Sequence, residues 1–125
     1  MSPRRTTFSQ RALAALFVGS GVNHFVLPGP YRAIVPPSLA GNARQLVEVS
    51  GVAEILGGVG VLIEPTRRAA GVGLVALLVA VFPANLYMAR APERFPRIPR
   101  RALYARLPLQ PLMMWWAWRA TRKVV

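Results

Sequence analysis

Residues 69–88 read AAGVGLVALLVAVFPANLYM, a run that contains no charged side chain. A helix of about 20 apolar residues is long enough to cross the hydrocarbon core of a bilayer. Residues 74–82 within the run carry no polar side chain, so a helix here would have no face suited to water. This stretch therefore predicts a membrane-spanning helix.

Three further apolar blocks of similar length flank this run, at residues 12–27, 46–63 and 102–118. Pro28 follows the first block, a polar turn at 64–68 follows the second, and an arginine- and proline-rich stretch at 90–101 precedes the last. The sequence therefore predicts an all-α integral membrane four-helix bundle in up-down-up-down order, a single domain over residues 1–125. The expected helices cover about residues 10–27, 44–63, 68–89 and 102–120.

The composition favours a membrane protein over a soluble helical bundle. Of the 125 residues, 54% are hydrophobic and 16% are charged, whereas average soluble domains carry about 25% charged residues. Cysteine is absent and His24 is the sole histidine. This excludes disulfides, thiolate metal sites, iron–sulfur clusters and bis-histidine haem ligation. The sequence therefore predicts no metal site and no intrinsic cofactor.

The chain is strongly basic, with 16 Lys and Arg against 4 Asp and Glu and a net charge of +12. The arginines fall in loops and at the ends of the expected helices, where lipid headgroups account for them, so we expect no nucleic-acid partner. On the side of the two ends, the basic residues slightly outnumber those of the alternate loops. This count includes Arg4 and Arg5 and the two arginines of the turn at 64–68. By the positive-inside rule, we expect a multi-pass inner-membrane protein with both termini in the cytoplasm.

Polar side chains inside the predicted spans form the candidate site. Ionisable groups at the centre of a bilayer cost about 2.5–3.5 kcal/mol on insertion scales, so they normally face partners or water. The up-down order places these side chains in one leaflet, on the side opposite both termini. The predicted ligand-binding residues are His24, Glu48, Glu54, Asn85, Arg106 and Gln110, and no catalytic residue is assigned.

The two carboxylates, Glu48 and Glu54, do not share a helix face. Six residues at about 100° each leave them about 120° apart, so one can line a cavity while the other pairs elsewhere. Glu54 is the strongest candidate, because it lies deepest and lacks an obvious cationic partner. Glu48 and Arg106 could instead form a structural ion pair, and Asn85 and Gln110 could equally hold helices together.

Prolines and small residues predict where the bundle is open and where it is closed. Pro83, Pro108 and Pro111 indicate kinks that widen the bundle near the polar groups. Small residues of the second and third expected helices can face one another and close the cytoplasmic end. These small residues are Ala53, Gly57 and Gly60 on one helix, and Gly71 and Gly73 on the other.

Several short motifs follow one another along nearly the whole chain. They are HFxxPxxYxxxVPP at 24–37, VSG at 49–51, EILGG at 54–58, FPANLYM at 82–88, RLPLQ at 106–110 and WAW at 116–118. This series resembles the small bacterial membrane proteins grouped as DoxX-like. The resemblance implies a four-helix inner-membrane fold, with some relatives tied to a terminal quinol oxidase or to thiol redox systems. It implies no catalytic residues, and the absence of cysteine argues against a thiol-redox role.

Two classes of function follow from these observations. The first is a non-catalytic membrane subunit or a binder of a quinone-like or other amphiphile, with the lipid bilayer and other membrane subunits as partners. The second is a membrane enzyme or proton-coupled carrier that uses Glu54 or Glu48 as its protonatable group and His24 as a relay. The chain offers no redox centre, which favours the first class. A purely structural assembly protein would tolerate apolar replacement of each polar residue.

Overall fold

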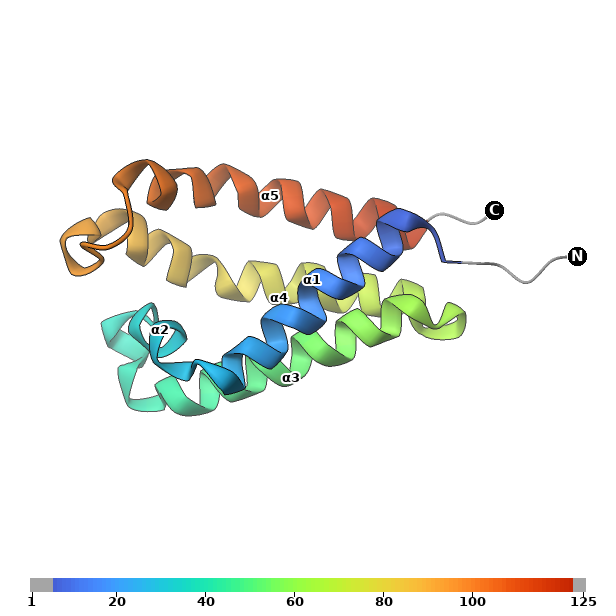
Figure 1. Ribbon diagram of the computed structural model, residues 1–125, viewed down its shortest axis with the longest axis horizontal. Helices are drawn as coiled ribbons and strands as arrows, with labels where there is room; N and C mark the ends of the chain where they lie inside the picture. The colour runs from blue at the N-terminus through green and yellow to red at the C-terminus, as the bar shows by residue number, and fades with distance from the viewer. Residues whose placement is uncertain (1–5, 123–125) are drawn as a thin grey trace, which may run out of the picture.

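The computed structural model describes residues 6–122, and the regular elements in this range are all helices (Figure 1). The described residues contain no strand, which confirms the all-α prediction. Arg4 and Arg5, on which the expected orientation depends, lie outside these residues. The α-helices are α1 (Phe8–Val26), α2 (Pro28–Ala33), α3 (Ala43–Leu62), α4 (Glu64–Arg90) and α5 (Arg100–Arg122), and the 3₁₀ helices are η1 (Pro37–Asn42) and η2 (Pro92–Arg94).

Two of the long helices begin at residues suited to a helix N-terminus. The Thr7 hydroxyl accepts the backbone N–H of Gln10 at 3.1 Å, and the Gln10 side chain accepts the N–H of Thr7 at 3.0 Å, which caps α1. Pro65 fits the first turn of α4, because its missing N–H needs no partner there. The polar turn predicted at 64–68 is therefore wrong: this stretch begins α4, and Ile63 alone separates it from α3.

Short helices occupy the two longer connections. Elements α2, η1 and η2 begin at Pro28, Pro37 and Pro92, because the fixed φ of proline suits the first turn of a helix. Pro28 and Pro92, which follow the ends of α1 and α4, thus also begin the next short helix. This second effect was absent from the prediction, which treated the connections as breaks.

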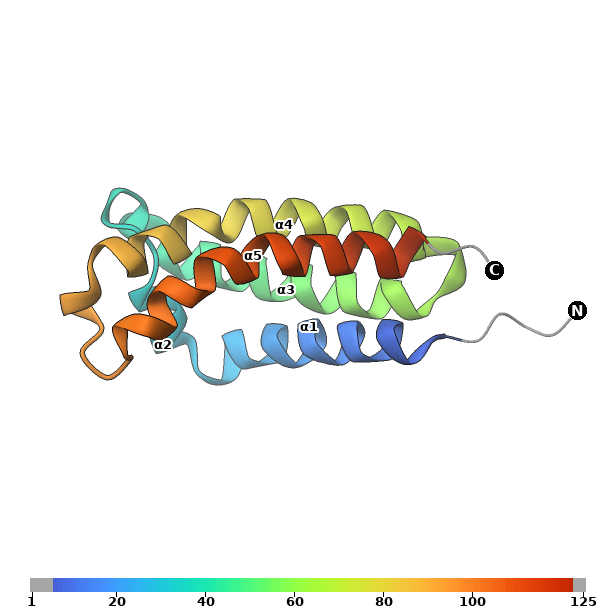
Figure 2. The ribbon, with the colours of Figure 1, turned by 90° about the horizontal axis from the view of Figure 1, so that it is seen from above.

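The long helices α1, α3, α4 and α5 run side by side along the molecule (Figures 1 and 2). Helix α1 packs on α3, α3 on α4, and α4 on α5. We call the end where α1 begins and α5 ends the terminal end. There Gln10 Nε2 donates to the carbonyl of Ala120 at 2.9 Å, and Trp116 Nε1 donates to Ser9 Oγ at 2.7 Å. The opposite end, with α2, η1 and η2, is the loop end (Figure 1).

Glycines bring the backbones of α1 and α3 into contact. A Cβ atom at Gly21 would lie 2.6 Å from the carbonyl oxygen of Gly51, and one at Gly58 would lie 3.0 Å from the carbonyl oxygen of Ala14. Both distances are shorter than ordinary van der Waals contact, so the close crossing of these helices depends on glycine.

The small residues of α3 and α4 pack differently from the prediction. Gly57 and Gly60 do face α4, where an added Cβ would meet Leu74 or Ala70. Gly71 instead faces Thr121 of α5, and nothing lies within 4 Å of a Cβ at Gly73. The predicted contact of these two α4 glycines with the α3 stripe is wrong, because α4 turns them toward α5 and toward the surface.

Two segments are long and apolar enough to cross a membrane, Pro37–Leu62 and Glu64–Arg90. Among the described residues, those of α1 and α5 do not meet the same test of length and composition. Only 28% of the most apolar window of the first segment and 22% of that of the second is buried within the protein. Most of this apolar surface is therefore left uncovered by the other residues between 6 and 122.

Buried apolar side chains form two clusters. The larger cluster joins all four long helices in the half of the molecule nearer the terminal end, and the smaller one lies at the loop end. The larger cluster contains Leu13, Phe17, Val61, Leu74, Leu78, Ala117 and Ala120. The smaller contains Met88, Phe95 and Leu103, with Ile34 and Tyr87 packed against it.

Candidate functional site

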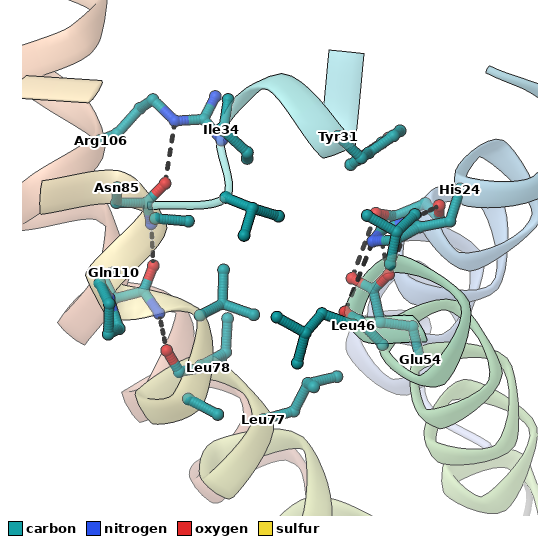
Figure 3. Close-up of a pocket in the computed structure, with 18 of the residues that line it drawn as sticks. His24, Tyr31, Ile34, Leu46, Glu54, Leu77, Leu78, Asn85, Arg106 and Gln110 are labelled. Carbon is teal, nitrogen blue, oxygen red and sulfur yellow. Dashed lines mark hydrogen bonds and ion pairs between the residues drawn. The ribbon is translucent and has the colours of Figure 1, made fainter. Parts of the chain in front are cut away.

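A cavity of about 520 Å³ lies between the two apolar clusters, within the range of about 300–1,000 Å³ typical of small-molecule sites (Figure 3). One wall comes from α1 and α3, and the facing wall from α4 and α5. The segment at 31–39 covers the loop end of the cavity. Most of the lining is aliphatic, and the polar groups gather in one cluster on each wall (Figure 3).

The cluster on the first wall is built around His24 of α1 and Glu54 of α3. The Nδ1 atom of His24 lies 3.2 Å from Oε2 of Glu54. The hydroxyl of Ser20 donates to the same carboxyl group, 3.2 Å from Oε1 and 3.4 Å from Oε2. The side chain of His24 is 8% exposed and that of Glu54 is 12% exposed. The α1–α3 wall therefore presents an imidazole and a carboxyl group held by neighbouring side chains.

Backbone and side-chain contacts orient the ring of His24. Its Nδ1 atom also lies 2.7 Å from the carbonyl oxygen of Ser20. A carbonyl oxygen only accepts, so Nδ1 carries the proton, and in the neutral ring Nε2 accepts from the hydroxyl of Ser50 at 3.4 Å. Tyr31 stacks on the imidazole with ring centroids 3.9 Å apart, and its hydroxyl accepts from Asn23 Nδ2 at 2.9 Å.

The cluster on the second wall is a chain of hydrogen bonds between α4 and α5. Arg106 Nε donates to Asn85 Oδ1 at 3.1 Å, and Asn85 Nδ2 donates to Gln110 Oε1 at 2.5 Å. Gln110 Nε2 in turn donates to the carbonyl oxygen of Leu78. Pro83 of α4 has no N–H to donate to the carbonyl four residues earlier, that of Val79, which is the neighbour of Leu78. Both amide side chains are buried.

Five of the six predicted site residues line this cavity. They are His24, Glu54, Asn85, Arg106 and Gln110.

Glu48 does not line the cavity. It lies on another face of α3, where its carboxylate is 3.5 Å from Arg44 Nε, one turn earlier, in a largely exposed ion pair. Its assignment to the site is therefore wrong, and so is the predicted ion pair between Glu48 and Arg106, whose Nε donates to Asn85 instead. Glu54, for which no cationic partner was obvious from the sequence, lies beside His24, whose ring is a cation only when it is protonated.

The sequence profile of the domain of unknown function DUF8561 matches residues 13–121. The chain belongs to this family. Every residue that lines the cavity falls within the part that matches DUF8561. No curated protein and no solved structure matches the chain.

Three further residues of this DUF8561 cavity were missed as site residues. Ser20 and Ser50 precede His24 and Glu54 by four residues on α1 and α3, so helical spacing alone could have placed them beside the predicted residues. Tyr31 reaches the site from α2, a helix that the sequence did not predict. Tyr87, near Asn85 on α4, does not line the cavity and packs edge-on against Phe95 at the loop end.

The chemistry available in the cavity is hydrogen bonding and proton exchange. Among residues 6–122, no three His, Cys, Asp or Glu side chains come together in a way that could hold a metal ion. The groups that face the cavity are a carboxyl, an imidazole, two serine hydroxyls, a tyrosine hydroxyl, two amides and a guanidinium. Such groups bind and orient a polar head, while the aliphatic lining accommodates an apolar body.

Proposed function

We propose that this DUF8561 chain is an integral membrane protein whose long helices α1, α3, α4 and α5 all span the bilayer. In this proposal the cavity binds an amphiphile such as a quinone, and the protein is a binding protein or membrane subunit that catalyses no reaction. The observation that carries the binding role is the cavity itself, which places polar clusters on two facing walls of an otherwise aliphatic space.

Exposed apolar side chains support the membrane assignment for all four helices. Leu56 of α3 is 67% exposed, and Val79 of α4 is 55% exposed. Helices α1 and α5 pack beside these two and also expose large apolar residues, including Val22 at 46% and Leu112 at 61%. Soluble monomers rarely expose contiguous apolar surface of this kind. A bilayer would cover all four helices together.

The location and orientation remain part of the proposal. We place the protein in the bacterial inner membrane with both termini in the cytoplasm and the cavity in the outer leaflet. The start of α1 and the end of α5 lie at one end of the molecule (Figure 1). The residues that line the cavity lie toward the other end. The resemblance to DoxX-like proteins agrees with such an arrangement and is retained as a hypothesis.

Native mass spectrometry with solvent extraction tests the binding role on protein purified in mild detergent. We expect an amphiphile to co-purify with the wild type and to be lost from Glu54→Gln. The matched control is Glu48→Gln, which changes the same residue type on the same helix outside the cavity. A wild-type protein without any bound amphiphile, and as stable as both variants, would contradict the proposal.

The contact between His24 and Glu54 favours one alternative, a proton-coupled carrier or membrane enzyme. A carboxyl group beside an imidazole, both largely buried, is an arrangement that can take up and pass on a proton. In that case Glu54→Gln would abolish turnover or proton uptake in proteoliposomes while the protein still folds. A binding protein would lose only affinity, because there is no chemistry to lose.

A further inference from the structure

Arg106 has hydrogen-bond donors to spare. A guanidinium carries five N–H groups, and the one on Nε donates to Asn85. The remaining N–H groups of Arg106 have no hydrogen-bond partner among residues 6–122. The guanidinium extends over the cavity toward Ile34 (Figure 3).

The amide chain beneath Arg106 holds the guanidinium in this place. Asn85 Oδ1 accepts from Arg106 because its own Nδ2 donates to Gln110, which donates onward to the carbonyl of Leu78. The chain ends on a backbone carbonyl, which only accepts, so both amides are fixed in one orientation. Neither amide can turn to offer Arg106 a donor in place of the acceptor.

Charge in the cavity is arranged asymmetrically. Within the described part of the chain, Arg106 is the one arginine or lysine that lines the cavity, and Glu54 is the one acidic residue. They belong to opposite walls (Figure 3). An anionic group is therefore attracted to the α4–α5 wall, which holds the guanidinium, rather than to the wall that holds the carboxyl group.

Resting on the proposed amphiphile-binding function, we propose that the ligand of this cavity has an anionic oxygen headgroup, a carboxylate or a phosphate, which Arg106 binds. Its apolar tail lies along the aliphatic lining, against residues such as Leu46, Leu77 and Val81. A neutral carbonyl, as in a quinone, would use the same N–H groups, but charge-assisted hydrogen bonds are roughly twice as strong as neutral ones. Asn85 and Gln110 are positioning residues that act through Arg106.

Pairs of probes with matched tails test this inference by native mass spectrometry on the full chain in a neutral detergent. Oleate is compared with oleyl alcohol, and dioleoyl phosphatidylglycerol with dioleoylglycerol, which has the same two tails and lacks the phosphate. Decylubiquinone serves as the neutral acceptor. We expect the anionic member of each pair to bind at least about tenfold more tightly, which is the size of effect that a charged hydrogen bond gives. Preference for oleate identifies a free acid as the ligand, and preference for phosphatidylglycerol identifies a membrane lipid.

Variants locate the preference at Arg106. Arg106→Gln should remove the discrimination between oleate and oleyl alcohol. Arg106→Lys, which keeps the charge but loses the contact to Asn85, should retain part of it. Arg101→Gln on the same helix is the matched control, since Arg101 does not line the cavity, and should behave as the wild type. Should Arg106→Gln fail to fold, the Lys variant and the wild-type probe pairs still decide the question.

Two outcomes separate this inference from the proposed function. If decylubiquinone or oleyl alcohol binds the wild type as tightly as oleate and phosphatidylglycerol do, the anionic headgroup is wrong while amphiphile binding stands. If no probe binds the wild type, the proposed function fails as well.

Discussion

The imidazole of His24 joins two helices: its Nδ1 atom lies 2.7 Å from the backbone carbonyl of Ser20 and 3.2 Å from Oε2 of Glu54. The Ser20 hydroxyl donates to the same carboxyl group at 3.2 Å. Ser20 of α1 thus contacts Glu54 through its side chain and His24 through its backbone carbonyl. The polar wall of the cavity is a closed set of contacts in which each member orients the next.

Replacing Glu54 with leucine should destabilise the protein by about 1–3 kcal/mol, because the hydroxyl of Ser20 would lose the carboxyl group that accepts from it. Glu48→Leu should change stability by less than about 0.5 kcal/mol, since its ion pair with Arg44 is largely exposed. Thermal unfolding of both variants in the same detergent measures the difference. Equal stabilities would show that the contacts of Glu54 contribute nothing to the fold.

The two buried amides of the second wall should be energetically coupled. We expect a double-mutant cycle of Asn85→Leu and Gln110→Leu to give a coupling free energy of about 0.5–3 kcal/mol, because either change leaves the other amide without its partner. The measurement is the unfolding free energy of the two single variants and the double variant. Strict additivity would mean that the bond between the two side chains does not form.

The long helices were largely predictable because two strong signals coincide in the sequence. Largely apolar runs form their middles, and Pro28, Pro65 and Pro92 lie at or near helix ends. Pro83, Pro108 and Pro111 lie inside α4 and α5 instead. The prediction went wrong at residues 64–68, where charged side chains indicated a turn. In the structure Pro65 begins α4 there, and the basic side chain of Arg67 is satisfied by the Val61 carbonyl at 2.7 Å. Proline stops one helix and starts another, so its position alone does not fix the length of a connection.

For the site residues, the position along the bundle was easier to predict from the sequence than the direction in which each side chain points. Counting residues placed His24, Asn85 and Arg106 near one end, which is where the structure has them. Helical spacing also separated Glu48 from Glu54, but it did not say which of the two faces inward. That choice depends on the glycine contact of α1 with α3, which sets the rotation of α3. Tyr31 was unpredictable because it reaches the cavity from α2, a short helix in the connection between two long helices, which the sequence did not predict.

The crossing of α1 and α3 gives a prediction with an internal control. Gly21→Ala should destabilise the protein by about 1–3 kcal/mol, because the added methyl group meets the carbonyl of Gly51. Gly19→Ala, on the same helix with nothing within 4 Å, should be neutral or stabilising by up to about 1 kcal/mol. Unfolding of the two variants under identical conditions tests this. A Gly21 variant as stable as the Gly19 variant would contradict the close crossing.

Filling the cavity should displace its ligand without unfolding the protein. Ala84 of α4 lines the cavity, so Ala84→Phe places a ring inside it and should reduce the amount of co-purifying amphiphile. Ala76→Phe is the matched control on the exposed surface of the same helix, outside the cavity. Mass spectrometry of extracted lipid gives the readout. Retention of the same amphiphile by the Ala84 variant would place the binding site elsewhere.

The hydrogen bonds that join the two walls of the cavity are concentrated at the terminal end of the bundle. At the terminal end, the bonds from Gln10 to Ala120 and from Trp116 to Ser9 join α1 to α5. Within residues 6–122, no hydrogen bond crosses the cavity itself, because each polar cluster is complete within its own helix pair. Apolar contact is non-directional, so the walls can part or approach without breaking a polar bond. The walls are therefore fixed to each other by hydrogen bonds at the terminal end, and the width of the cavity can adjust to ligands of different thickness.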